Sequence, residues 1–334
     1  MSLIFDALQR SEGERSGADQ SSLPAVTELL QRVEHEAVSE WRTALQTELT
    51  DTTKSTERKE APPIATAVES PATDEVSLND QRLNQLAHLQ TLRVSIPFQS
   101  QLVSLTESEG IAAENFRFLG VRLRHMRRER PLQKVLITST IPHEGKSMVS
   151  ANLACTLARK KQQRTLLVEG DLRRPSLLQM FGIDNMPGIC EWVQGESSQI
   201  TNIYHLDIPH LENSGLWILP AGRCTGNPLE LLQSGKLHAF TDQLATLFDW
   251  IVIDSPPILP LADTSVWSRM ADGILLITRH GVTEKHQLQR GLEALDHKKV
   301  IGALLNGSQS SALSDHYYNY HPSTVSRQDN QTEE

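Results

Sequence analysis

The chain has 334 residues, of which 38% are hydrophobic and 5% aromatic, and it carries a formal net charge of -9. Residues 1–100 hold 9 Lys and Arg against 16 Asp and Glu, so this acidic part is not a nucleic-acid arm, and we expect no nucleic-acid partner. No apolar run reaches the roughly 18 residues that a membrane-spanning helix needs, and no signal-peptide pattern opens the chain.

The first 110 residues form an acidic region that we predict to be partly helical. Residues 1–10 favour a short amphipathic helix or a frayed terminus, and residues 24–48 carry Leu, Val and Trp at helical spacing. Residues 50–80 combine Pro, Ser, Thr and mixed charge without an aromatic side chain. Such a segment buries too little apolar surface to fold, so we expect a disordered linker there.

From about residue 112 onward, apolar runs alternate with helical patterns. The expected strands are Val135–Thr138, Leu166–Val168, Trp217–Leu219, Ile251–Ile253, Ile274–Thr278 and Val300–Leu305. Uniformly apolar strands separated by helices predict an α/β domain over residues 111–307, with a doubly wound, mostly parallel sheet covered by helices on both faces. Its ligand site should lie beyond the carboxyl ends of the strands. Residues 308–334 form a polar tail.

A phosphate-binding loop follows the first of these strands. Gly145, Lys146 and Ser147 stand between strand and helix, as in the P-loop of nucleotide-binding proteins. Successive backbone N–H groups and the helix N-terminus would hold a β-phosphate, Lys146 would add a charge, and Ser147 would ligate Mg²⁺. Thr140 stands where the motif usually begins with glycine.

Two further strands end in acidic residues. Glu169 and Asp171 follow the second strand, and Asp254 ends the Ile251–Ile253 run in a Walker B pattern. Because the carboxyl ends of parallel strands meet at one edge of a sheet, we expect these carboxylates to face the lysine of the loop and to help hold Mg²⁺.

Several segments together resemble the bacterial tyrosine kinases (BY-kinases) of capsule and exopolysaccharide synthesis, within the MinD/ParA-like P-loop ATPases. The segments are IPHEGKSMVSANLA (Walker A), LLVEGDLRRPSL (Walker A′), FDWIVIDSPP (Walker B), GNPLELLQSGKL, ADTSVWSRMADGILLITR and IGALLNG. The resemblance covers about residues 112–307. It implies an ATP-dependent protein tyrosine kinase that mainly phosphorylates itself and its neighbours.

The resemblance also implies roles for individual residues. ATP contacts are expected from Glu144, Gly145, Lys146, Ser147, Met148 and Asn306, with Asn306 touching the adenine. Mg²⁺ is expected on Ser147, Asp254 and Asp171, and catalysis from Glu169, Asp171 and Lys146. Glu169 replaces the family's usual aspartate, so Glu169→Asp should keep or raise activity.

The segment before the domain resembles the opening of the family's assembly helix, E-x-x-R-x-x-R. Glu114 and Arg117 match it, whereas Gly120 replaces the second arginine, which makes a ring-shaped homo-oligomer uncertain. The same region is basic, with Arg117, Arg122, Arg124, Arg127, Arg128, Arg130 and Lys134 against Glu129. It is either a solvated helix face or a contact for an acidic partner or anionic lipid.

Three of the four tyrosines, Tyr317, Tyr318 and Tyr320, lie in the polar tail, and Tyr204 is the fourth. We expect the tail tyrosines to be the phosphate acceptors. We also expect a cytoplasmic protein that a membrane-bound polysaccharide co-polymerase recruits and activates. A MinD/ParA-like ATPase switch and an ATP-binding regulatory pseudokinase are the alternatives. The three cysteines, Cys155, Cys190 and Cys224, lack C-x-x-C spacing and predict reduced thiols.

Overall fold

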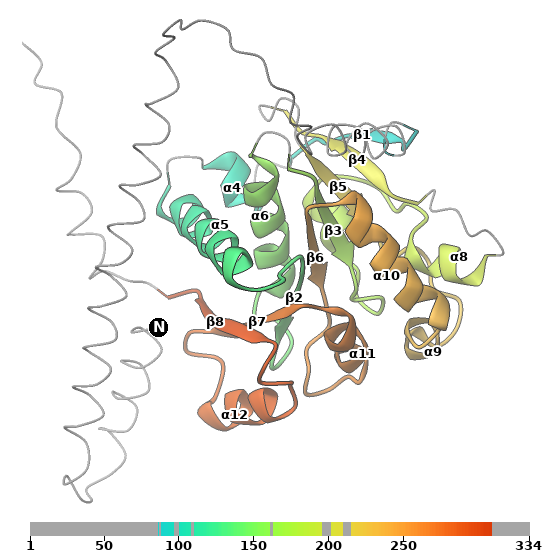
Figure 1. Cartoon of the computed structure of the whole chain (residues 1–334). Helices are drawn as coiled ribbons and strands as arrows, with labels where there is room; N and C mark the ends of the chain where they lie inside the picture. Colours follow the sequence, from blue (N-terminus) through green and yellow to red (C-terminus); the bar gives the residue numbers. More distant parts are fainter. Residues whose placement is uncertain are drawn as a thin grey trace, which may run out of the picture. The chain divides into compact units, whose positions relative to one another are not determined.

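The computed structural model describes residues 86, 88–96, 100–107, 110–160, 163–195, 202–209 and 215–308. The chain divides into two compact units, Met1–His88 and Leu89–Glu334, and the second holds every helix and strand discussed below (Figure 1). The helices expected at 1–10 and 24–48, the linker at 50–80 and the tyrosines of the tail lie outside the described residues.

An eight-stranded sheet, in the order β1-β4-β5-β3-β6-β2-β7-β8, forms the centre of the second unit. Its strands are β1 (Thr91–Arg93), β2 (Lys134–Ser139), β3 (Thr165–Glu169), β4 (Tyr204–Asp207), β5 (Leu216–Leu219), β6 (Trp250–Asp254), β7 (Gly273–Arg279) and β8 (Val300–Asn306). All neighbours pair in parallel except β4 with β5. The six predicted strands are confirmed, and the mostly parallel α/β fold with them. The sequence analysis missed β1 and β4.

Helices connect the strands. They are α4 (Val103–Thr106), α5 (Ile111–Glu129), α6 (Lys146–Ala158), α7 (Leu177–Met180), α8 (Ile189–Gln194), α9 (Pro228–Leu232), α10 (Gly235–Leu247), α11 (Asp263–Met270) and α12 (Lys285–Glu293). Local chemistry explains the start of α9: the Asn227 side chain accepts a hydrogen bond from the Leu229 amide, and Pro228 occupies the first turn, where its missing N–H costs nothing.

The core lies on both faces of the central strands. Every residue of β3 and β6 is buried, as is every residue of β2 after Lys134. On one face Trp250 and Val252 pack with the Ala- and Leu-rich helix α6, which is buried from Val149 to Ala158. The alternate residues Ile251 and Ile253 are equally buried, so the other face is covered as well.

The second unit begins at Leu89, and its first strand precedes the α/β domain expected over residues 111–307. Thr91 and Arg93 pair with His205 and Asp207, so β1 belongs to the sheet. Among the residues that the structure describes, every helix is too short or too polar to cross a lipid bilayer.

The cysteines differ from the expectation of three reduced thiols. Cys190 and Cys224 form a disulfide across a sequence separation of 34, with their Cα atoms 5.0 Å apart, and Cys155 is free and buried in α6. The prediction is therefore wrong for this pair. It failed because the sheet, and not local spacing, brings the two residues together.

Candidate active site

A cavity of about 760 Å³ lies where β2, β3 and β6 end. The phosphate loop and the segment after β3 contribute most of its polar lining, which includes Lys146, Ser147, Asp171, Arg173, Arg174, Ser176 and Gln179. The segment after β6 contributes the apolar residues Pro257, Pro260 and Leu261. Met148 also lines the cavity. The cavity is thus at the carboxyl edge of the parallel strands, where the sequence placed the ligand site.

Contacts within the phosphate loop and with Asn306, at the end of β8, hold the loop in a fixed shape. Gly145 adopts φ +89°, and a Cβ at this position would collide with Nδ2 of Asn306, so only glycine fits. Asn306 Nδ2 donates to the Glu144 carbonyl oxygen at 2.9 Å. Asn306 therefore lies against the loop from the end of β8.

Glu144 has a structural role that the sequence analysis did not foresee. Its carboxylate is fully buried and accepts hydrogen bonds from the Thr140 hydroxyl at 3.0 Å and the Ile141 amide at 2.9 Å. The Thr283 hydroxyl also bonds to it. Thr140, which replaces the usual first glycine, thus closes the loop through a side-chain contact.

Lys146 and Asp171 face each other across the cavity. Lys146 Nζ lies 3.5 Å from Asp171 Oδ2, and the two side chains are only 12% and 6% exposed. The Asp171 Oδ1 atom accepts a hydrogen bond from the Arg174 amide at 3.1 Å, which fixes the carboxylate. The structure therefore brings together these two predicted residues, and both line the cavity.

Asp254 is a buried acid beside the start of α6. It is 1% exposed and accepts a hydrogen bond from the Ser150 hydroxyl at 3.1 Å. Burial raises its pKa from the ordinary 3.8 to about 7, with Asp171 and Glu169 adding to the rise, while Lys146 and a hydrogen bond from Ser147 oppose it. Asp254 is therefore a carboxylate that a nearby cation would keep ionised.

These oxygen donors fit Mg²⁺. Mg²⁺ is usually held by one or two protein groups together with phosphate oxygens and water, and Ser147 and Asp254 offer a hydroxyl and a carboxylate. The described residues contain no cluster of three or more His, Cys, Asp or Glu that could hold a metal by themselves. Any ion here would accordingly depend on the nucleotide for the rest of its ligands.

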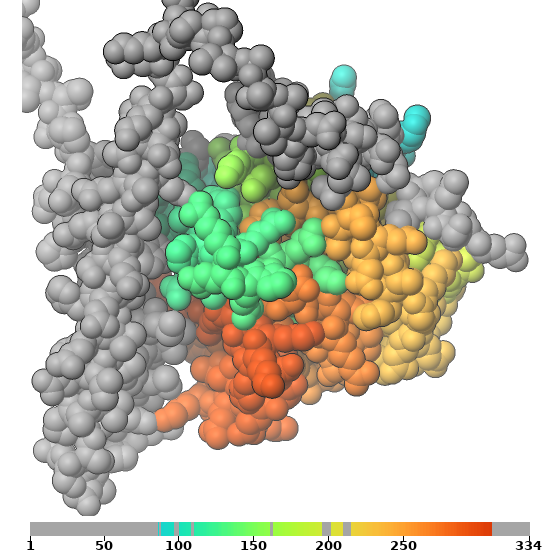
Figure 2. All heavy atoms as spheres, viewed as in Figure 1, coloured from blue at the N-terminus to red at the C-terminus, as the bar shows by residue number. Residues whose placement is uncertain are grey.

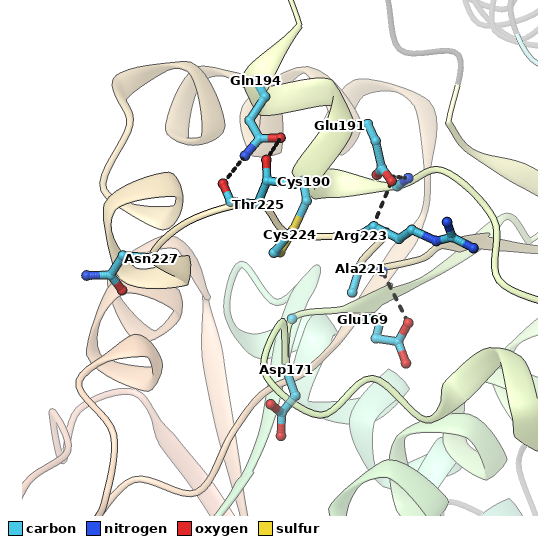
Figure 3. The surroundings of a disulfide bond; sticks show 12 residues. Glu169, Asp171, Cys190, Glu191, Gln194, Ala221, Arg223, Cys224, Thr225 and Asn227 are labelled. Carbon is cyan, nitrogen blue, oxygen red and sulfur yellow. Dashed lines mark hydrogen bonds between the residues drawn. A yellow bond between two sulfur atoms is a disulfide. The ribbon is translucent and has the colours of Figure 1, made fainter.

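Glu169 does not line this cavity, although Asp171, two residues further on, does. Figure 3 shows the two carboxylates pointing in different directions. Its carboxylate is 1% exposed and accepts hydrogen bonds from the amides of Ser176 at 2.5 Å, Leu177 at 2.6 Å and Ala221 at 3.1 Å. Burial raises its pKa, and these three amides oppose the rise. The Glu169 carboxylate therefore fixes the backbone of the residues that donate to it and lines no part of the large cavity.

Gly170 separates the two acids and explains their divergence. Its amide donates to the Asp254 carbonyl oxygen at 2.7 Å, and its own carbonyl oxygen accepts from the Trp267 indole at 3.0 Å. A Cβ at this position would lie 2.7 Å from the Asp254 carbonyl oxygen. The chain is thus pinned between Glu169 and Asp171, so the two carboxylates leave in different directions.

Of the four tyrosines, only Tyr204 lies within the described residues. It is 4% exposed, and its hydroxyl donates to the Pro187 carbonyl oxygen at 3.0 Å. Burial and, second, the charge of Glu191 raise its pKa. Tyr204 is a core residue and not an accessible acceptor.

The sequence analysis missed two sets of contacts around the site. Arg173 forms a two-pronged ion pair with the buried Asp263, at 2.7 and 3.1 Å, and it lines the cavity. Arg279 donates to the His143 carbonyl oxygen at 3.0 Å, which holds the outer part of the phosphate loop. Asp263 stands in the matched segment after Walker B, so it could have been singled out, whereas nothing local marks Arg279.

The arginines of the basic helix α5 differ in burial. Arg127 donates to the Asp249 carbonyl oxygen at 2.7 Å and lies over the Trp250 ring, whereas Arg122 and Arg128 are exposed. Figure 2 shows atoms of α5, in green, on the surface of the face in view. Gly120 is buried, and a Cβ there would lie 3.3 Å from Thr156 of α6, so this position faces the helix's own domain.

Comparisons with known proteins find bacterial tyrosine kinases among the relatives of this chain. No family model matches the chain. The tyrosine-protein kinase YwqD of Bacillus subtilis is 32% identical over 227 residues, which cover 66% of this chain and 91% of that protein. The succinoglycan biosynthesis transport protein ExoP of Rhizobium meliloti is 31% identical over 68% of this chain, but the chain spans only 29% of that protein's length. The kinase domain of the Escherichia coli tyrosine kinase ETK superposes with a TM-score of 0.57 at 26% identity, covering 65% of this chain and 83% of that domain.

Proposed function

The chain belongs to the bacterial tyrosine-protein kinases, and from this we propose that it is an ATP-dependent protein tyrosine autokinase acting in capsule or exopolysaccharide synthesis and export. The observation that carries the proposal is the pairing of Lys146 with Asp171 at 3.5 Å in the cavity that the phosphate loop lines, with the buried Asp254 close to Lys146 and Ser147. These are the groups that phosphoryl transfer from a nucleotide requires: a cation for phosphate, a metal-holding acid and a base.

Each group has a role that follows from its position. The backbone amides at the start of α6 and the Lys146 ammonium bind the phosphates of ATP. Ser147 and Asp254 would hold Mg²⁺, which neutralises phosphate charge when bound. Asp171 accepts the proton of the incoming tyrosine hydroxyl, because its carboxylate lines the cavity, whereas that of Glu169 does not. Glu169 is a positioning residue that keeps the segment after β3 in place.

The phosphate acceptors are Tyr317, Tyr318 and Tyr320 of a neighbouring copy. The burial of Tyr204 supports this assignment, since it removes the remaining tyrosine from contention. The roughly 11 residues from Asn306 to Tyr317 extend over at most about 36–40 Å, enough for a tail to enter another subunit's cavity. Each phosphate adds about -1.5 to -2 charges, so a modified tail would be repelled by the acidic site and released.

A membrane-bound polysaccharide co-polymerase activates the kinase and recruits it to the inner face of the membrane. Arg122 and Arg128 of α5 provide an exposed cationic surface for its acidic segment. Reconstitution with vesicles that carry such a partner should raise phosphotransfer. Equal activity of the isolated chain in dilute solution would contradict the activating role, and Arg122→Ala with Arg128→Ala would test the surface.

Incubation with Mg-ATP followed by mass spectrometry of phosphotyrosine tests the central proposal. A Lys146→Met chain mixed with a chain whose three tail tyrosines are Phe should acquire phosphate on its own tail, because transfer runs between subunits. A tail that stays unmodified while other residues are labelled would contradict the acceptor assignment. ATP hydrolysis without phosphotyrosine would indicate an ATPase switch, and binding without turnover a pseudokinase.

A further inference from the structure

The segment after β5 is fastened to the start of α8 by a set of backbone contacts. We call residues 220–224 the strap. The Ile189 amide donates to the Pro220 carbonyl oxygen and the Cys190 amide to that of Ala221, each at 2.9 Å. Glu191 of α8 accepts from the Arg223 amide at 2.8 Å. The Cys190–Cys224 disulfide closes the far end of the strap on the same helix (Figure 3).

The strap is also bonded to the segment that carries Asp171. The Ala221 amide donates to Glu169 Oε2 at 3.1 Å, and Glu169 Oε1 accepts from Ser176 and Leu177. The buried carboxylate of Glu169, which precedes Asp171, is therefore bonded both to the strap and to Ser176 and Leu177, which follow Asp171. A change in the strap reaches the catalytic base through one side chain.

The strap has little freedom while it is fastened. Gly222 adopts φ +76°, and a Cβ there would collide with the Glu191 carboxylate and lie 2.7 Å from the Gly188 amide nitrogen. Beyond Cys224 the constraint weakens: Thr225, Gly226 and Asn227 are exposed, although the Thr225 hydroxyl bonds to Gln194 at 3.1 Å. The disulfide thus marks the boundary between the packed strap and the exposed turn before α9.

The two sulfurs differ in access. Cys190 is fully buried, whereas Cys224 is half-buried between the exposed residues Arg223 and Thr225. A reducing thiolate would therefore attack the Cys224 sulfur and displace Cys190 as the leaving thiolate. The Cα separation of 5.0 Å lies in the range that disulfides require.

We propose that Cys190 and Cys224 form a redox-active site whose oxidation state sets the rate of phosphoryl transfer. In oxidation the two thiols lose two protons and two electrons to a low-molecular-weight disulfide such as oxidised glutathione, which becomes two thiols. A dithiol reductant reverses the step and is itself oxidised to a disulfide. The oxidised form holds Ala221 on Glu169 and keeps Asp171 in register, and the reduced form loosens both. The effect on rate rests on the proposed kinase function, whereas the existence of the bond does not.

The redox state should change turnover and leave nucleotide binding nearly unchanged. The phosphate loop contributes no residue to the strap, and Asn306, Thr283 and Arg279 hold its residues Glu144 and His143. Its contact with the segment after β3 is the ion pair between Lys146 and Asp171. Asp171, by contrast, depends on the loop that Glu169 holds. We expect reduction to lower kcat about threefold to tenfold, since small displacements of a reacting group are costly, with KM for ATP within about twofold.

Thiol counting tests the bond without any kinase assay. The full chain is equilibrated with oxidised or reduced glutathione, denatured in the presence of an alkylating reagent and analysed by mass spectrometry. The expected result is one alkylated cysteine, Cys155, after oxidation and three after reduction. A peptide pair joined through Cys190 and Cys224 confirms the assignment. Three alkylated cysteines under both conditions would overturn it.

Activity measurements test the consequence, with matched variants. Cys224→Ser, at the half-buried position, should have a kcat close to that of the reduced protein, and this kcat should not change with the glutathione redox state. Cys190→Ala should behave in the same way. Cys155→Ala keeps the pair and should respond as the wild type does. A redox response that persists in Cys224→Ser, or a wild-type kcat that is equal in both states, would overturn the control of rate.

A chain with no tyrosine phosphorylation in either state would instead refute the proposed function. Hydrogen exchange at residues 220–227 would then still report whether the bond fastens the strap.

Discussion

Asn306 donates a hydrogen bond to the main-chain oxygen of Glu144 at 2.9 Å and fills the space that a side chain at position 145 would need. The end of β8 and the phosphate loop are therefore packed as one surface. Contacts from Arg279, at the end of β7, and from Thr283, in the β7–α12 connection, reach the same loop. The expected adenine side and the phosphate side of the nucleotide site are coupled through the backbone of Glu144.

Asn306→Ala should raise KM for ATP about fivefold and leave kcat almost unchanged. The loss of one neutral hydrogen bond costs about 1 kcal/mol, and here it also frees the loop that binds phosphate. Calorimetric titration with a non-hydrolysable ATP analogue measures the change. Asn306→Asp has the same shape without the donor and should bind no better than Asn306→Ala. Wild-type affinity in Asn306→Asp would show that the hydrogen bond is unimportant.

Lys146→Met should weaken nucleotide binding roughly tenfold to a hundredfold and abolish phosphotransfer. The side chain is 12% exposed, so its contact with phosphate forms in a poorly solvated site, where a hydrogen bond to a charged group contributes about 1.5–3 kcal/mol. Binding of a fluorescent ATP analogue gives the affinity. An unchanged dissociation constant would show that the phosphates lie elsewhere.

Glu169→Asp should lower kcat at least about tenfold, contrary to the expectation from the family's usual aspartate. The shorter side chain cannot reach the amides of Ser176, Leu177 and Ala221 together, so two or more buried N–H groups would lose their acceptor. Glu169→Gln, which keeps the length, should lose less. Thermal unfolding would show a lower Tm for Glu169→Asp than for Asp171→Asn. Activity of Glu169→Asp at or above that of the wild type would show that the three amide hydrogen bonds to Glu169 are not needed for catalysis.

Asp254→Asn should remove a pH dependence of stability from the nucleotide-free protein. Because the folded pKa of Asp254 is raised to about 7, its contribution to stability is full below about pH 4 and is lost as the pH rises through about 7. The wild type should therefore lose Tm relative to the variant between about pH 4 and pH 7, where the carboxyl is ionised in the unfolded chain and protonated in the folded one. Binding of Mg-ATP should favour the ionised carboxylate and release a proton, which calorimetry in two buffers detects. Parallel Tm curves for the two proteins would contradict the raised pKa.

The sequence predicted the central sheet well because its buried strands are continuous apolar runs, as at Leu166–Val168 and Ile251–Ile253. It failed for β1, whose short segment Thr91–Arg93 is partly exposed at the sheet edge and has no such run. The convergence of Lys146, Asp171 and Asp254 also followed from strand order. The direction of the Glu169 side chain could not be predicted from the sequence, because it depends on the tertiary positions of Ser176 and Ala221, whose amides donate to its carboxylate. The pairing of Cys190 with Cys224 depends on the same tertiary approach.

The strand β1 also determines where a truncated fragment of this protein can begin. It pairs in parallel with β4, whose only other neighbour is β5. A fragment that starts at residue 111 would uncover the backbone N–H and C=O groups of Tyr204–Asp207 along one whole side. Unpaired edges of this kind are templates for intermolecular pairing. Fragments for crystallisation or binding studies should therefore include Gln90 and β1, and we expect those that begin after Arg93 to self-associate through β4.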